Sequence, residues 1–138
     1  MTAVDLEGPG VVSHIWLTVA ASEYGWPRLL RLRVYYDGSV TPSVDAPLGD
    51  FFAVGHGFER PVRSLMVRAS SEGRSRNSYW PMPFRRSCRI TVTNEGRRRV
   101  PDVVEPDDLA VRGVEEPVRF PHLLLEVRRS PSHRPRGP

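Results

Sequence analysis

Residues 11–19, VVSHIWLTV, decide the fold class of this 138-residue chain. Apolar and polar side chains alternate there with a period of two, and β-branched and aromatic residues are frequent, which is typical of a strand. The face expected in a core carries Val11, Ser13, Ile15, Leu17 and Val19, and the other face carries Val12, His14, Trp16 and Thr18. On that second face we expect His14 to be a surface or second-layer residue rather than a ligand.

Another strand with a clear pattern follows. Residues 29–36 alternate in the same way, and Asp37-Gly38 supplies the positive φ that a tight hairpin turn needs. Pro42 and Pro47 limit the segment between them to an edge or irregular strand, because proline donates no hydrogen bond to a ladder.

Residues 47–57, PLGDFFAVGHG, interrupt the strand pattern. No secondary-structure period explains an acidic residue, two aromatics and an imidazole between glycines. We interpret the stretch as a loop displayed by a β scaffold, where binding groups tend to lie. The alternative is a glycine-rich connector whose Phe51 and Phe52 pack into the core.

The remaining patterned segments complete an all-β reading. Residues 62–69 and 88–93 are predicted strands. Two prolines exclude a central strand over residues 77–84. We expect this segment to display Tyr79 beside the 47–57 loop. Cys88 is expected to be a small buried hydrophobe. Because no amphipathic helix of useful length precedes Gly96, we predict an antiparallel sandwich or jelly roll.

Composition limits the function classes. The hydrophobic fraction of 39% and mean hydropathy of −0.38 fit a globular protein, and no signal peptide or membrane-spanning segment is visible, so we expect a cytoplasmic location. All 20 basic residues are arginine and the net charge is +4. Arginine alone points to a GC-rich gene, and the even spread of charge makes nucleic acid the least favoured partner.

The composition changes at Gly96. Residues 97–138 hold 9 of the 20 arginines, 7 of the 14 prolines and only one aromatic, Phe120. Such a segment buries too little apolar surface to offset its ordering entropy. We predict two parts: residues 1–96 form a partial jelly-roll domain, and residues 97–138 form an irregular or disordered tail or an out-of-frame sequence. Within the tail, only residues 120–127 are expected to order, as a short helix or an edge strand.

Five stretches, in order, resemble one family: DLEGPGVVSHIWLT (5–18), LRVYYDG (32–38), PLGDFF (47–52), NSYWPMPF (77–84) and ITVTNEG (90–96). They are similar to the domain of unknown function 2961, or glycoside hydrolase family 172, over about residues 3–96. The resemblance implies a jelly roll that is the first of two in each protomer, and assembly as a homotrimer or larger. It also implies retaining hydrolysis or transfer of fructofuranosides and arabinofuranosides by two glutamates, without a metal.

The family's catalytic glutamate stretches do not occur in this sequence, so the resemblance assigns no catalytic residue. Because the family's reaction uses no metal, we also expect no metal or other cofactor. Asp50, His56, Asn77 and Tyr79 lie in family-like loops and are predicted to line a pocket for a carbohydrate ligand. The first functional hypothesis is a truncated furanosidase-like fragment with an incomplete jelly roll, inactive by itself. The alternative is a carbohydrate-binding or subunit-interaction module without catalysis.

Overall fold

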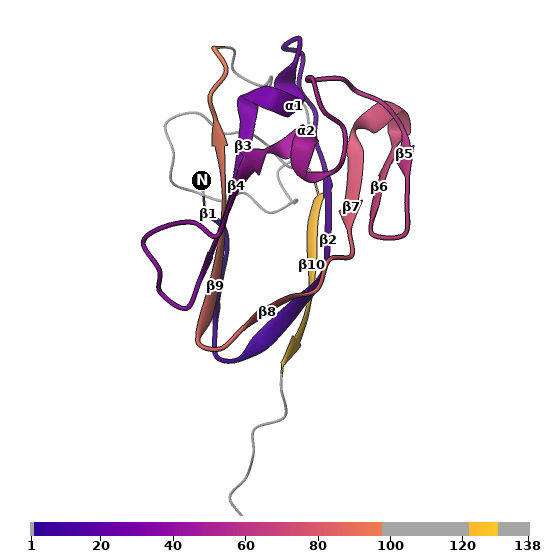
Figure 1. Ribbon diagram of the computed structural model, residues 1–138. Coiled ribbons are helices and arrows are strands. Elements are labelled where there is room, and N and C mark those ends of the chain that lie inside the picture. The colour runs from indigo at the N-terminus through magenta and orange to yellow at the C-terminus, as the bar shows by residue number, and fades with distance from the viewer. Residues whose placement is uncertain (1, 98–121, 130–138) are drawn as a thin grey trace, which may run out of the picture.

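Two antiparallel sheets face each other in the computed structural model, which describes residues 2–97 and 122–129 (Figure 1). The four-stranded sheet has the order β1 (Thr2–Glu7), β9 (Ser87–Asn94), β3 (Leu30–Tyr36), β4 (Val44–Pro47). The six-stranded sheet has the order β10 (His122–Arg129), β2 (Gly10–Thr18), β7 (Ser75–Ser78), β6 (Val67–Ser70), β5 (Val62–Arg63), and β8 (Met82–Phe84) also pairs with β2. The predicted all-β antiparallel sandwich is confirmed.

Three short helical segments join the strands: α1 (Trp26–Leu29), α2 (Leu48–Phe51) and the 3₁₀ turn η1 (Ser71–Gly73). Helices α1 and α2 pack together at one end of the sandwich (Figure 1). The core between the sheets consists of Val12, Ile15, Leu17, Val19, Trp26, Leu30, Leu32, Val34, Leu48, Phe52, Met82, Phe84, Cys88, Ile90 and Val92.

A β-bulge in β2 corrects one sequence prediction. In the pairing with β10, Val127 lies opposite Val12 and Glu126 opposite His14, so Ser13 is an extra residue. The bulge reverses the faces on its N-terminal side. Val12 is therefore fully buried and Val11 is not, the opposite of the expected assignment, whereas Ile15 is buried as predicted.

The segment 62–69 is also corrected, because it forms two strands rather than one. A turn between β5 and β6 reverses the chain, and Ser64 closes it: its Oγ donates to the carbonyl oxygen of Val67 at 2.9 Å and accepts from the Val67 N–H at 3.0 Å. These side-chain hydrogen bonds offer the backbone an alternative to a continuous ladder. The turn leaves the Leu65 side chain 88% exposed.

Other sequence predictions hold. β4 is an edge strand, and β3 buries Leu30, Leu32 and Val34 in alternation. β10 overlaps the 120–127 stretch and is an edge strand. The rest of the predicted tail, residues 98–121 and 130–138, lies outside the described residues, so the domain boundary at residue 96 stays a prediction.

Asp37 joins two turns of the sandwich. Both Asp37 and Gly38 have positive φ, 57° and 80°, and the Ser39 N–H donates to the Tyr36 oxygen at 3.0 Å, which confirms the turn and its positive φ. The expected tight hairpin is wrong, because residues 37–43 separate β3 from β4. Asp37 Oδ1 accepts from the backbone N–H groups of Arg85 (2.9 Å) and Arg86 (2.6 Å), between β8 and β9, and of Ser87 (3.3 Å), the first residue of β9. These bonds, chiefly that from Arg86, lower the pKa of Asp37.

We expect Asp37→Asn to be less stable than the wild type at neutral pH, because an amide oxygen is a weaker acceptor than a carboxylate. A lowered folded-state pKa means that the carboxylate's contribution is complete above the unfolded pKa of about 3.9 and is lost as pH falls through the folded value. Thermal unfolding at pH 7 and pH 3 should therefore show a gap in Tm that shrinks in acid. Asparagine tolerates positive φ, so the backbone is unchanged. A gap that is equal at both pH values would contradict this role.

Candidate functional site

Asn77 and Tyr79 come together with His14 on the outer face of the six-stranded sheet. His14 lies beside a core residue on β2, so its side chain points away from the core. His14 Nε2 donates to Asn77 Oδ1 at 3.0 Å. The rings of His14 and Tyr79 stack with centroids 4.5 Å apart and an interplanar angle of 6°. Three side chains from two distant parts of the sequence are thus held against one another.

Trp16 extends this group along β2. It lies opposite Asn77 in the β2–β7 register, and its Nε1–H donates to Ser75 Oγ at 3.0 Å, which orients the indole. We call His14, Trp16, Asn77 and Tyr79 the Tyr79 cluster. Tyr79 is 38% exposed. Aromatic faces beside hydrogen-bonding groups suit a sugar ring, which has apolar C–H faces and polar hydroxyl groups.

Asp50 and His56, the other two predicted site residues, lie at the α1–α2 end. Asp50 Oδ2 lies 3.6 Å from Arg28 Nη1 in an exposed ion pair. His56 is exposed with φ of 61°, and its ring centroid lies 6.2 Å from that of Phe58. The contacts of Tyr79 are with His14 and Met66, neither of which belongs to the 47–57 loop. The four predicted residues therefore fall into two groups, and their contact with a sugar stays a prediction.

The 47–57 segment closes one end of the core. Leu48 and Phe52 are fully buried and Val54 is 5% exposed, while Phe51 packs partly against the core. A Cβ on Gly49 would lie 2.6 Å from the Val54 carbonyl oxygen, which shows how closely the chain packs there. The connector alternative is correct for Phe52, and α2 replaces part of the expected loop.

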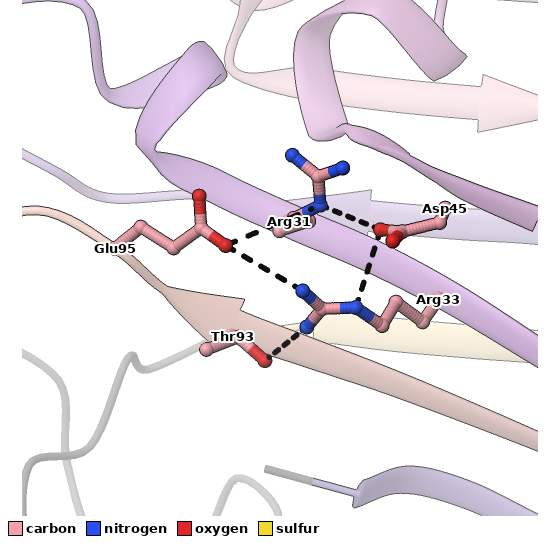
Figure 2. A network of polar contacts seen from close by, with 5 residues as sticks. All are labelled: Arg31, Arg33, Asp45, Thr93 and Glu95. Atoms are coloured by element: carbon pink, nitrogen blue, oxygen red, sulfur yellow. Dashed lines mark hydrogen bonds and ion pairs between the residues drawn. The ribbon is translucent and has the colours of Figure 1, made fainter. Parts of the chain in front are cut away.

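A network of charged side chains lies on the outer face of the four-stranded sheet (Figure 2). Arg31 and Arg33 of β3 both contact Asp45 of β4, with Nε–Oδ1 distances of 2.5 and 3.2 Å. Arg33 Nη2 lies 3.6 Å from Glu95 Oε1, and its Nη1 donates to Thr93 Oγ1 at 3.0 Å. The hydrogen bond from Arg31 lowers the pKa of Asp45, so this carboxyl group stays ionised. The network joins three strands, and its Asp45 carboxyl group offers no protonated acid at neutral pH.

Cys88 and the possible metal ligands complete the survey of reactive groups in the described residues. Burial raises the pKa of the Cys88 thiol to about 11, which keeps it protonated, in agreement with the predicted buried hydrophobe. Across residues 2–97 and 122–129, no group of three or more His, Cys, Asp or Glu side chains could hold a metal ion. In the same residues, no helix is long and apolar enough to cross a membrane.

Sequence reasoning missed the contribution of His14 and Trp16. Both were assigned correctly to one face of a strand, but their partners lie 63 and 59 positions away. The available signal was the pair itself, because an imidazole and an indole two residues apart on a non-core face form an uncommonly aromatic strip. The partner strand could not be identified, since residues 75–78 carry no alternating pattern.

Comparison with protein families gives one finding. The family model for the GH172 first beta-sandwich domain matches residues 1–99. A search of curated proteins finds no match. The matched range contains both sheets except β10, and it contains the whole Tyr79 cluster.

Proposed function

The chain belongs to the GH172 family as a first β-sandwich domain, and from this membership we propose that it supplies a sugar-binding surface to a glycoside hydrolase without cleaving glycosides itself. The Tyr79 cluster carries the proposal. Its stacked His14 and Tyr79 rings are already oriented, so a sugar ring can be bound with little further loss of side-chain freedom. Furanosides such as arabinofuranosides are the sugars we propose, and assembly into a homotrimer or larger remains a prediction.

The arrangement of carboxylates supports binding rather than cleavage. A retaining glycosidase needs two carboxyl groups about 5 Å apart, one of which is an acid with a raised pKa. Asp37 and Asp45 both have lowered pKa values, because backbone N–H groups and arginines stabilise their charged forms. Asp50 is paired with Arg28 instead of a second carboxylate. We infer that catalytic glutamates, as the family resemblance implies them, lie outside residues 2–97.

Tyr79→Ala should weaken binding of an α-(1→5)-linked arabinofuranotriose about tenfold, because it removes the exposed ring of the platform. Isothermal titration is the measurement. Tyr24→Ala is the matched control, since Tyr24 is 92% exposed and lies in the loop before α1. Its affinity should equal that of the wild type.

Two results would overturn the proposal. One is equal weakening by both tyrosine substitutions, which would remove the special role of the Tyr79 cluster. The other is turnover of an aryl α-arabinofuranoside that Asp50→Asn abolishes, which would place a catalytic carboxylate at the α1–α2 end.

A further inference from the structure

Two arginines continue the Tyr79 cluster across the six-stranded sheet. The registers align Trp16 of β2 with Asn77 of β7, Asn77 with Arg68 of β6, and Arg68 with Arg63 of β5. Residues directly opposite each other in antiparallel strands point to the same face. The outer face therefore carries one row in the order indole, amide, guanidinium, guanidinium. We call Trp16, Asn77, Arg68 and Arg63 the cross-strand row.

The sequence neighbours of Arg68 confirm that the two arginine side chains point away from the core. Val67 and Ala69, on either side of Arg68, are 5% and 3% exposed and face the core, whereas Arg63 and Arg68 are exposed. The β5–β6 hairpin thus presents both guanidinium groups on the outer face, beside the amide that His14 holds.

The β5–β6 hairpin carries two positive charges that face each other. Directly opposed like charges on adjacent strands are destabilising. Within the described part of the chain, neither Arg63 nor Arg68 has an ion-pair partner, whereas Arg31 and Arg33, on the other sheet, share Asp45 and Glu95. Two facing guanidinium groups with no ion-pair partner among the described residues are suited to bind an anion.

We propose that the cross-strand row binds an acidic oligosaccharide, with a sugar ring on the Tyr79 cluster and the carboxylate of a uronic acid unit on Arg68 and Arg63. The inference rests on the proposed function and widens its ligands from neutral furanosides to sugar chains that carry an acidic unit. Neighbouring strands are about 4.8 Å apart, so the row spans about 14 Å, which suits a short oligosaccharide rather than a single sugar. Guanidinium groups bind planar carboxylates through two parallel hydrogen bonds, so a uronate fits better than a neutral sugar at that end.

The experiment compares trigalacturonate with its fully methyl-esterified form by isothermal titration at low salt. The wild type should bind the acid about tenfold more tightly than the ester. Arg63→Gln/Arg68→Gln should remove most of that preference, by weakening binding of the acid much more than binding of the ester. Arg85→Gln/Arg97→Gln removes the same charge from exposed arginines outside the row and should preserve the preference. Tyr79→Ala should weaken both ligands.

The outcomes separate this inference from the proposed function. Equal binding of acid and ester, with both lost in Tyr79→Ala, would overturn the anionic substrate and keep the sugar-binding surface. Failure of both ligands and of the arabinofuranotriose to bind would overturn both. Binding of inorganic sulfate alone with the affinity of trigalacturonate, or tighter binding of a single-stranded oligonucleotide, would also overturn the acidic oligosaccharide.

Discussion

Gly73→Ala should be among the most destabilising single-methyl additions in the described part of this protein, lowering the free energy of unfolding by about 2–5 kcal/mol. Gly73 has φ of 91° at the end of η1, between β6 and β7. A Cβ there would lie 2.5 Å from the backbone nitrogen of Arg60 and 2.8 Å from the carbonyl carbon of Glu59. Because both contacts are backbone atoms, no side-chain rotation relieves them.

The matched control is Gly38→Ala, in the turn after β3. Gly38 has φ of 80°, but a Cβ on it would meet no atom within 4 Å. This substitution therefore measures the conformational cost alone, about 1–2 kcal/mol. Urea unfolding of both variants isolates the steric cost at Gly73 as the difference. Equal destabilisation would show that the Glu59–Arg60 backbone moves aside easily.

The same turn links stability to the binding surface. Gly73 lies between the two strands whose register places Arg68 opposite Asn77. A Gly73→Ala protein that still folds should therefore lose affinity for trigalacturonate more than Gly38→Ala does.

A structural feature could be predicted from the sequence when the residues that determine it are close together in the chain. Alternation within residues 29–36 is local, so β3 and its core face were predictable. The faces of β2 were only half predictable, because the bulge at Ser13 depends on pairing with β10, more than 100 positions away. The two halves of the Tyr79 cluster are 63 positions apart, and only the β2–β7 register brings them together.

Arg76 was the least predictable residue of all. The sequence around it, Arg74-Ser-Arg-Asn77, is polar throughout and would place an arginine in solvent. The register instead sets Arg76 opposite Leu17 and Ala69, both core residues, and its side chain is fully buried. The pairing of β7 between β2 and β6 turns Arg76 into the interior, whereas Arg74 lies just before β7 and is exposed.

Arg76→Met should raise the free energy of unfolding by about 1–3 kcal/mol, a gain that follows from the balance of forces on the buried guanidinium. Burial lowers the pKa of Arg76 to about 10, and the charge of Glu59 opposes that shift, so the group remains charged at neutral pH. Within the described residues, its Nε, Nη1 and Nη2 atoms have no hydrogen-bond acceptor. Its compensating contact is a cation–π interaction with Trp26, with Cζ 5.1 Å from the ring centroid.

These magnitudes favour the apolar side chain. A desolvated cation–π contact contributes about 2 kcal/mol, whereas desolvating an ion costs several kcal/mol even after relaxation. Methionine has a similar length and flexibility, so it fills the space and places its sulfur against Trp26. Arg74→Met is the matched control: Arg74 is exposed and pairs with Glu59 at 3.6 Å, so the same substitution should change stability by less than about 0.5 kcal/mol. Urea unfolding of the two variants gives the comparison. If Arg76→Met were less stable than the wild type while Arg74→Met were unchanged, the guanidinium would gain more from Trp26 and Glu59 than it loses on burial.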